Sequence, residues 1–199
     1  MDEMREEAKD MIRFYVWGGW HSPREVFDII DEEVFDCDGE NDKWLRSAIE
    51  KEFDKKLEKE KTWPKLTTFD RLDQAFTALR KQGILAQHRC GLTQQDGLEV
   101  VEDLYKEEGG KKSGITGHFY YTHEDMEGAM EGADGLLLAF GSFSKGSAAE
   151  VGRLIKHEME KNGFKVVWDG TEKTRLLLSG FRWQKRSPRR KSRTDQDES

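Results

Sequence analysis

Residues 141–147 come nearest to a known chemistry, which is phosphate binding. Gly141 and Gly146 are five positions apart and Ser147 follows the second glycine. In a phosphate-binding P-loop, a Lys follows the second glycine and reaches the outer phosphates. Here Lys145 precedes Gly146, so the pattern is incomplete. We therefore interpret Ser147 as the N-cap of a helix whose exposed N-terminus is able to hold an anion.

A second set of polar residues follows a predicted short strand at residues 84–89. The candidate ligand-binding residues here are His88, Thr93, Gln94 and Asp96. Loops after strands commonly line binding clefts. The structural alternative is that Asp96 caps the helix that follows and His88 is a partly exposed strand residue. His88 and Cys90 would share a strand face, but no second pair of ligands completes a metal site, so we predict no metal and no cofactor.

The third candidate set is Trp168, Asp169 and Arg175. Asp169 and Gly170 form a favourable turn pair between two predicted strands at residues 164–168 and 175–183. Arg175 is placed either to pair with Asp169 across the turn or to clamp an anion. Exposed Arg–Asp pairs are common and contribute little to stability. None of the three sets forms a complete catalytic constellation, so we predict no catalytic residue.

The elements that must position these side chains are predicted from periodicity and caps. Helices are expected to residue 16, from Ser22, from about 41 to before Pro64, and from Thr67 to Gly83. Further helices are expected from Asp96 to 109, from Thr122 to 133 and from Ser147, with Glu150 completing a capping box, to Gly163. Strands are expected at 84–89, 115–121, 136–140, 164–168 and 175–183. This order predicts an α+β fold: a helical N-terminal part packed on a mixed sheet of about five strands with strand–helix–strand units.

The charge divides the chain unevenly. Residues 1–62 hold 19 acids and 11 bases, a net of −8, whereas residues 182–199 carry a net of +4. We expect one domain at 1–183, with a helical part (1–82) and a sheet part (83–183), and a disordered basic tail at 184–199. The negative charge of residues 1–62 would repel nucleic-acid phosphates, which disfavours nucleic-acid binding except through the basic tail. With two cysteines and no long apolar run, the composition favours a cytoplasmic protein without membrane contact.

Several spaced motifs resemble those of a family of uncharacterised bacterial proteins, a domain of unknown function. The resemblance rests on Trp63-Pro64, on Asp70-Arg71-Leu72-Asp73 followed by Ala75, Phe76, Leu79 and Gly83-Ile84, on Gly91, Thr93, Gln94, Asp96 and Gly97, and on Gly163-Phe164, Val166, Trp168-Asp169-Gly170 and Arg175. It spans most of residues 10–183. It implies a bacterial cytosolic protein and no particular reaction.

These observations favour a non-enzymatic protein-binding module of the immunity or regulatory type. Its acidic helices would bind a basic protein, because opposite charge accelerates encounter. The alternative is a small-molecule or anion-binding protein, or a small enzyme, with a cleft between the loops Gly91–Gly97, Gly141–Ser147 and Trp168–Arg175. The alternative requires those three loops to lie together.

Overall fold

The computed structural model describes residues 2–37, 39–144 and 146–188. These residues form seven α-helices, one short 3-10 helix (η1, Gly110–Lys112) and five strands, so the predicted α+β class is confirmed. The chain divides into two compact units, the first made of Met1–Lys65 with Gln184–Ser199 and the second of Leu66–Trp183. This division differs from the expected single domain with a helical part at 1–82. The helix after Pro64 groups with the sheet instead.

The first unit is built from three helices, α1 (Asp2–Gly18), α2 (Pro23–Val34) and α3 (Asp42–Glu60). Helix α2 begins at the predicted capping box, in which Ser22 and Glu25 satisfy each other's backbone N–H groups. The three helices share one apolar core of Ala8, Ile12, Val16, Val26, Phe27, Ile30, Phe35, Leu45, Ile49 and Phe53. Apolar burial of this kind is what holds short helices together.

The segment 184–188 belongs to this first unit. The backbone N–H and hydroxyl of Ser187 donate to Glu60 Oε1 at 2.8 and 2.9 Å, and Arg186 donates to the Pro64 carbonyl at 2.9 Å. The Lys185 ammonium lies 4.1 Å from the ring centroid of Trp20. These contacts differ from the expectation of a disordered tail from residue 184. The rest of that predicted tail, residues 189–199, lies outside the described residues.

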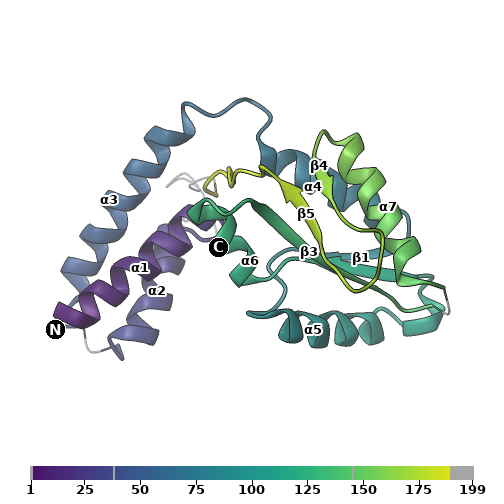
Figure 1. Cartoon of the computed structure of the whole chain (residues 1–199). Coiled ribbons are helices and arrows are strands. Elements are labelled where there is room, and N and C mark those ends of the chain that lie inside the picture. Colours follow the sequence, from purple (N-terminus) through teal and green to yellow (C-terminus); the bar gives the residue numbers. More distant parts are fainter. Residues whose placement is uncertain (1, 38, 145, 189–199) are drawn as a thin grey trace, which may run out of the picture. The chain divides into compact units, whose positions relative to one another are not determined.

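The second unit contains one mixed sheet with the strand order β1-β2-β3-β5-β4 (Figure 1). The strands are β1 (Ile84–Gln87), β2 (Gly117–Tyr120), β3 (Gly135–Ser142), β4 (Lys165–Val167) and β5 (Leu176–Ser179). β1 and β2 are parallel, and the other neighbouring pairs are antiparallel. The last two strands, between which Asp169 and Gly170 were predicted to turn, pair as an antiparallel hairpin. β5 lies between β3 and β4, which are themselves joined by a helix.

Helices cover both faces of this sheet (Figure 1). On one face lie α4 (Thr68–Arg80) and α7 (Ala148–Lys161), with Phe76 of α4 against Phe119 of β2 at 4.4 Å between ring centroids. On the other face lie α5 (Gln94–Glu107) and α6 (His123–Glu131). Gly97 lets α5 approach closely, because a Cβ there would overlap the ring of Tyr120.

Two predicted helix starts need correction. Helix α5 is capped by Thr93, with Asp96 as the third helical residue of a capping box, so Asp96 is not itself the N-cap. Ser147 caps α7 as predicted, but its hydroxyl accepts from Ala149 N and the expected box with Glu150 does not form. Among the described residues, no helix is both long and apolar enough to cross a membrane.

Candidate functional site

The candidate site lies where the parallel strands β1 and β2 end side by side. Each strand leads into a helix that begins with a Thr-x-x-Asp capping box, Thr93 with Asp96 on α5 and Thr122 with Asp125 on α6. Ligand sites in sheets with parallel strands commonly lie beyond the carboxyl ends of those strands. The two boxes are chemically alike, but only the second is buried and has an arginine as a further partner among the contacts of the described residues.

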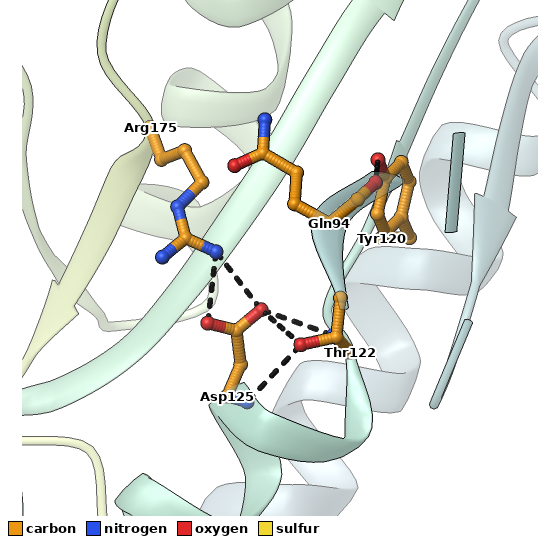
Figure 2. Close-up of polar contacts among 5 residues, drawn as sticks. All are labelled: Gln94, Tyr120, Thr122, Asp125 and Arg175. Carbon is orange, nitrogen blue, oxygen red and sulfur yellow. Dashed lines mark hydrogen bonds and ion pairs between the residues drawn. The ribbon is translucent and has the colours of Figure 1, made fainter. Parts of the chain in front are cut away.

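Arg175 and Asp125 form the central contact of this site (Figure 2). Nη1 of Arg175 lies 2.8 Å from Oδ1 and 3.0 Å from Oδ2 of Asp125. Oδ2 also accepts from the backbone N–H and the hydroxyl of Thr122, at 3.0 and 2.9 Å. The Asp125 side chain is 6% exposed and that of Arg175 is 29% exposed. The carboxylate is therefore held in one orientation, and it holds the guanidinium in turn.

The sheet register explains how residues so distant in sequence come together. Tyr120 of β2 is paired with Ala139 of β3, and Leu138 is paired with Leu176 of β5. Continuing the second register by one residue places Arg175 opposite Ala139. Tyr120, Ala139 and Arg175 thus form one row on the face that carries α5 and α6. The small side chain of Ala139 leaves room for its two large neighbours.

Tyr120 and Gln94 complete the group drawn in Figure 2. The Tyr120 hydroxyl donates to the Gln94 carbonyl at 2.7 Å, which ties the start of α5 to the sheet. Burial raises the pKa of Tyr120 to about 12, so its hydroxyl stays protonated at neutral pH. The Gln94 side chain is exposed, and its amide points toward Arg175 without a hydrogen bond between them.

The first N–H groups of α6 are already used within the chain. Those of Thr122 and Asp125 are bonded in the capping box. The N–H groups of His123 and Glu124 donate to the carbonyls of Gly91 and Leu92, at 3.1 and 3.3 Å. The loop after β1 therefore closes over this helix start. An anion beside α6 would therefore have to be bound by a side chain rather than by the N–H groups of this helix start.

His88 lies on the opposite face of the sheet from Arg175. Its ring stacks on Phe76 of α4, with centroids 3.9 Å apart. Nδ1 lies 3.1 Å from the hydroxyl of Tyr121 and Nε2 lies 3.2 Å from Asp73 Oδ1. Burial raises the pKa of Tyr121 well above its usual value, so this hydroxyl is neutral. The structure thus separates His88 from the other predicted site residues.

The residues of the last predicted loop also have structural partners. The indole N–H of Trp168 donates to the carbonyls of Thr171 and Thr174, and its ring covers Gly152 of α7. Asp169 Oδ1 accepts from Thr171 N at 2.8 Å and from the Thr174 hydroxyl at 2.6 Å. These bonds hold the pKa of Asp169 below its usual value. Arg175 therefore pairs with Asp125, and the alternative pairing with Asp169 across the turn is wrong.

The predicted loops do not surround one cleft. β3 is antiparallel to β2, so the Gly141–Ser147 loop leaves the sheet at the edge where β2 begins. Phe143 N donates to the Thr116 carbonyl at 3.0 Å, just before β2. Gly91–Gly97 lies at the other edge, after β1. Ser147 is thus far along the sheet from Thr93, Gln94 and Asp96. Within the predicted set, Thr93 and Asp96 bond each other in their capping box, and the Gln94 side chain lies toward Arg175 in Figure 2.

Cysteine and metal chemistry find little support in the part of the chain that the structure describes. That part contains no group of three or more His, Cys, Asp or Glu residues placed to hold a metal ion. Cys90 is buried, and burial raises its pKa to about 11, which disfavours the nucleophilic thiolate. Its Sγ lies 3.4 Å from the Gly97 carbonyl, so Cys90 acts as a small core residue.

Three members of the site were not among the predicted ligand-binding residues: Tyr120, Thr122 and Asp125. The sequence did indicate Thr122 as a helix start. The sequence pattern Thr122-x-x-Asp125 is the same as Thr93-x-x-Asp96. The burial of the Asp125 side chain and its ion pair with Arg175 both depend on the sheet register, which the pattern does not show. The pattern alone therefore carried no signal for these roles.

Fold and site together define an α+β protein with one arginine positioned by a buried carboxylate on a mixed sheet. The chain belongs to a protein family described as a domain of unknown function (DUF6891), whose model matches residues 1–187. The expected membership of a family of unknown function is thereby confirmed. The individual motifs and the bacterial origin stay predictions. No curated protein and no solved structure matches the chain.

Proposed function

We propose that the chain is a non-enzymatic protein-binding module of the immunity or regulatory type, which binds a basic partner through its first unit. The observation that carries this proposal is an acidic stretch at residues 28–42. It contains eight Asp or Glu residues and no Lys or Arg. We call residues 28–42 the acidic stretch below.

The acidic stretch is placed unfavourably for the fold itself. It covers the C-terminal half of α2, whose last turn contains no basic residue. A helix C-terminus carries partial negative charge, so acids there repel it. Glu32 and Glu33 are exposed, as is Asp36 just after the helix. None of these three side chains has an ion pair with another described residue, whereas Asp28 and Asp42 at the two ends pair with Arg24 and Arg46.

A cationic partner would relieve this repulsion. Complementary charge chiefly raises the rate of association and selects the partner, and its effect weakens as salt increases. The second unit offers less support for a competing activity, since its predicted site residues mostly cap helices or close turns. These two points together favour an interaction protein over an enzyme.

The test uses the tagged full-length chain, purified gently from its own host and examined by native mass spectrometry. The variant E32K/E33K/D36K reverses the unpaired charges of the acidic stretch. The matched control E102K/E107K/E127K makes the same charge change at exposed positions of the second unit. We expect a stoichiometric basic protein that is lost with the first variant and retained with the control. Equal loss with both variants, or a bare monomer for the unmodified chain, would contradict the proposal.

A further inference from the structure

Arg175 has donors that the fold does not use. Both contacts to Asp125 are made by Nη1. Nε and Nη2 have no hydrogen-bond partner among the described residues, and Figure 2 shows both on the side of the guanidinium that faces away from Asp125. The side chain is 29% exposed, so solvent reaches it. One edge of the guanidinium is therefore open.

The open edge has the geometry of an oxyanion receptor. Nε–H and one N–H of Nη2 are parallel donors in the plane of the guanidinium, and they match the two oxygens of a carboxylate or phosphate. Asp125 holds this plane in place through Nη1. A receptor arginine that is already oriented loses less side-chain entropy on binding than a freely rotating one.

The helix cap alone does not account for Arg175. Helix α5 begins with the same capping box as α6, and that box is complete without an arginine, because Asp96 accepts from Thr93 N and from its hydroxyl. In α6 the equivalent bonds of Asp125 to Thr122 are likewise present. The capping hydrogen bonds of α6 are therefore complete without Arg175, and the Arg175–Asp125 ion pair is not needed to cap this helix.

The surroundings distinguish between the two oxyanions. Arg175 and Asp125 have no net charge as a pair, and the chain as a whole carries −7. A phosphate dianion would meet more repulsion from Asp125 than a carboxylate monoanion would. On the same sheet face, two positions along β5, lies Leu177, which is paired with Val167 of β4. Val167 is 51% exposed, so apolar surface is available beside the arginine.

We propose that Arg175, oriented by Asp125, binds the carboxylate of a small organic acid whose apolar part covers Leu177 and Val167. The carboxylate accepts from Nε–H and Nη2–H in the guanidinium plane. The apolar part removes exposed side-chain surface from water, which supplies affinity that the salt-screened charge contact lacks. This site is independent of the acidic stretch on the first unit.

The experiment is an NMR titration of the ¹⁵N-labelled full-length chain, in which arginine Nε–Hε signals are followed. Hexanoate is the probe, and inorganic phosphate and hexanol are the comparison ligands at equal ionic strength. R175K identifies the Arg175 signal by its absence. We expect hexanoate to shift this signal saturably, hexanol not to shift it, and phosphate to shift it at least tenfold more weakly.

Variants test the two halves of the site. V167S should weaken hexanoate binding several-fold while leaving the phosphate response unchanged. D125N should weaken binding about tenfold, and D96N, which alters only the cap of α5, should not. Because D125N risks the fold, the titration of the unmodified chain decides the outcome. A phosphate response equal to or stronger than that of hexanoate, or no saturable shift with hexanoate, would overturn the proposal.

Discussion

Arg175 and Asp125 lie fifty positions apart, and one guanidinium nitrogen contacts both oxygens of the carboxylate, at 2.8 and 3.0 Å. The contact joins the residue just before β5 to the first turn of α6, and these two elements precede and follow β3 in the chain in the order α6, β3, β5. Since the carboxylate is almost fully buried, the pair links stability to the geometry of the candidate site.

Replacing Asp125 with Ala should destabilise the second unit strongly. The change removes the cap of α6 and leaves the Arg175 cation without its counter-ion, and breaking a buried pair costs about 3 kcal/mol or somewhat more. Partial exposure of Arg175 lowers this cost toward about 2 kcal/mol. Urea unfolding followed by circular dichroism would measure it. D96A removes only an exposed helix cap and should lower the free energy of unfolding clearly less. An equal loss of stability in both variants would contradict a stabilising role for the Arg175–Asp125 pair.

His118 should make the second unit acid-sensitive. Burial lowers the pKa of this ring from 6.5 to about 4, and its Nδ1 has no hydrogen-bond partner in the described part of the chain. Between pH 6.5 and 4 the unfolded chain binds a proton that the folded chain does not, so stability falls as pH falls. The full effect is about 3 kcal/mol.

The measurement for His118 is the difference in free energy of unfolding between the unmodified chain and H118F, taken from pH 7 to pH 4. The unmodified chain should lose more stability than H118F over this range. H157Q, which alters an exposed histidine on α7, is the control and should retain the full dependence. Parallel curves for the unmodified chain and H118F would rule out the predicted role.

Lys56 should reduce the stability of the first unit at neutral pH. Its side chain is fully buried, and its ammonium lies 3.4 Å from Glu60 Oε1 without a well-formed hydrogen bond. Burial lowers its pKa from 10.5 to about 8, so below pH 8 the folded state carries an unfavourable buried charge. As pH rises from 8 to 10.5, the unfolded state binds more protons than the folded state, and stability therefore increases.

The variant K56M removes that charge and replaces the lysine with an unbranched, flexible apolar side chain. It should raise the free energy of unfolding at pH 7 by about 1–3 kcal/mol, because apolar replacements of buried charges are often stabilising. The gain over the unmodified chain should shrink toward pH 10.5. The exposed neighbour K55M is the control. A loss of stability at pH 7 would show that the contact with Glu60 outweighs the burial of the charge.

Ser187 should hold the segment 184–188 against α3. Replacing it with Ala removes the hydroxyl donor to Glu60 but keeps the backbone donor, at a cost of about 1–2 kcal/mol for a bond to a charged acceptor. Amide hydrogen exchange of residues 184–187 and of the last turn of α3 should quicken. S187T, which keeps the hydroxyl, should restore protection, and unchanged exchange in S187A would contradict the contact.

Local patterns in the sequence predicted most of the elements correctly. The capping residues Ser22, Thr67 and Thr122 start helices as expected, and the apolar run at 136–140 lies within β3. These signals depend on neighbours within about four residues, which a sequence shows directly. The predicted start of α5 at Asp96 was wrong, because Thr93 and Asp96 are both residues that favour the N-cap position. Which of the two caps the helix depends on the path of the chain after β1.

The sequence by itself determined the α+β class, the positions of most helices and strands, and the acidic stretch between Arg24 and Lys43. Only the tertiary structure decided that Arg175 pairs with Asp125, that His88 faces away from it, and that the Gly141–Ser147 loop lies at the other edge of the sheet. It also decided that residues 184–188 join α3. The physical reason is that caps and periodicity are set by residues a few positions apart, whereas these contacts depend on strand order and register, which bring together residues on different elements, from twelve to more than a hundred positions apart.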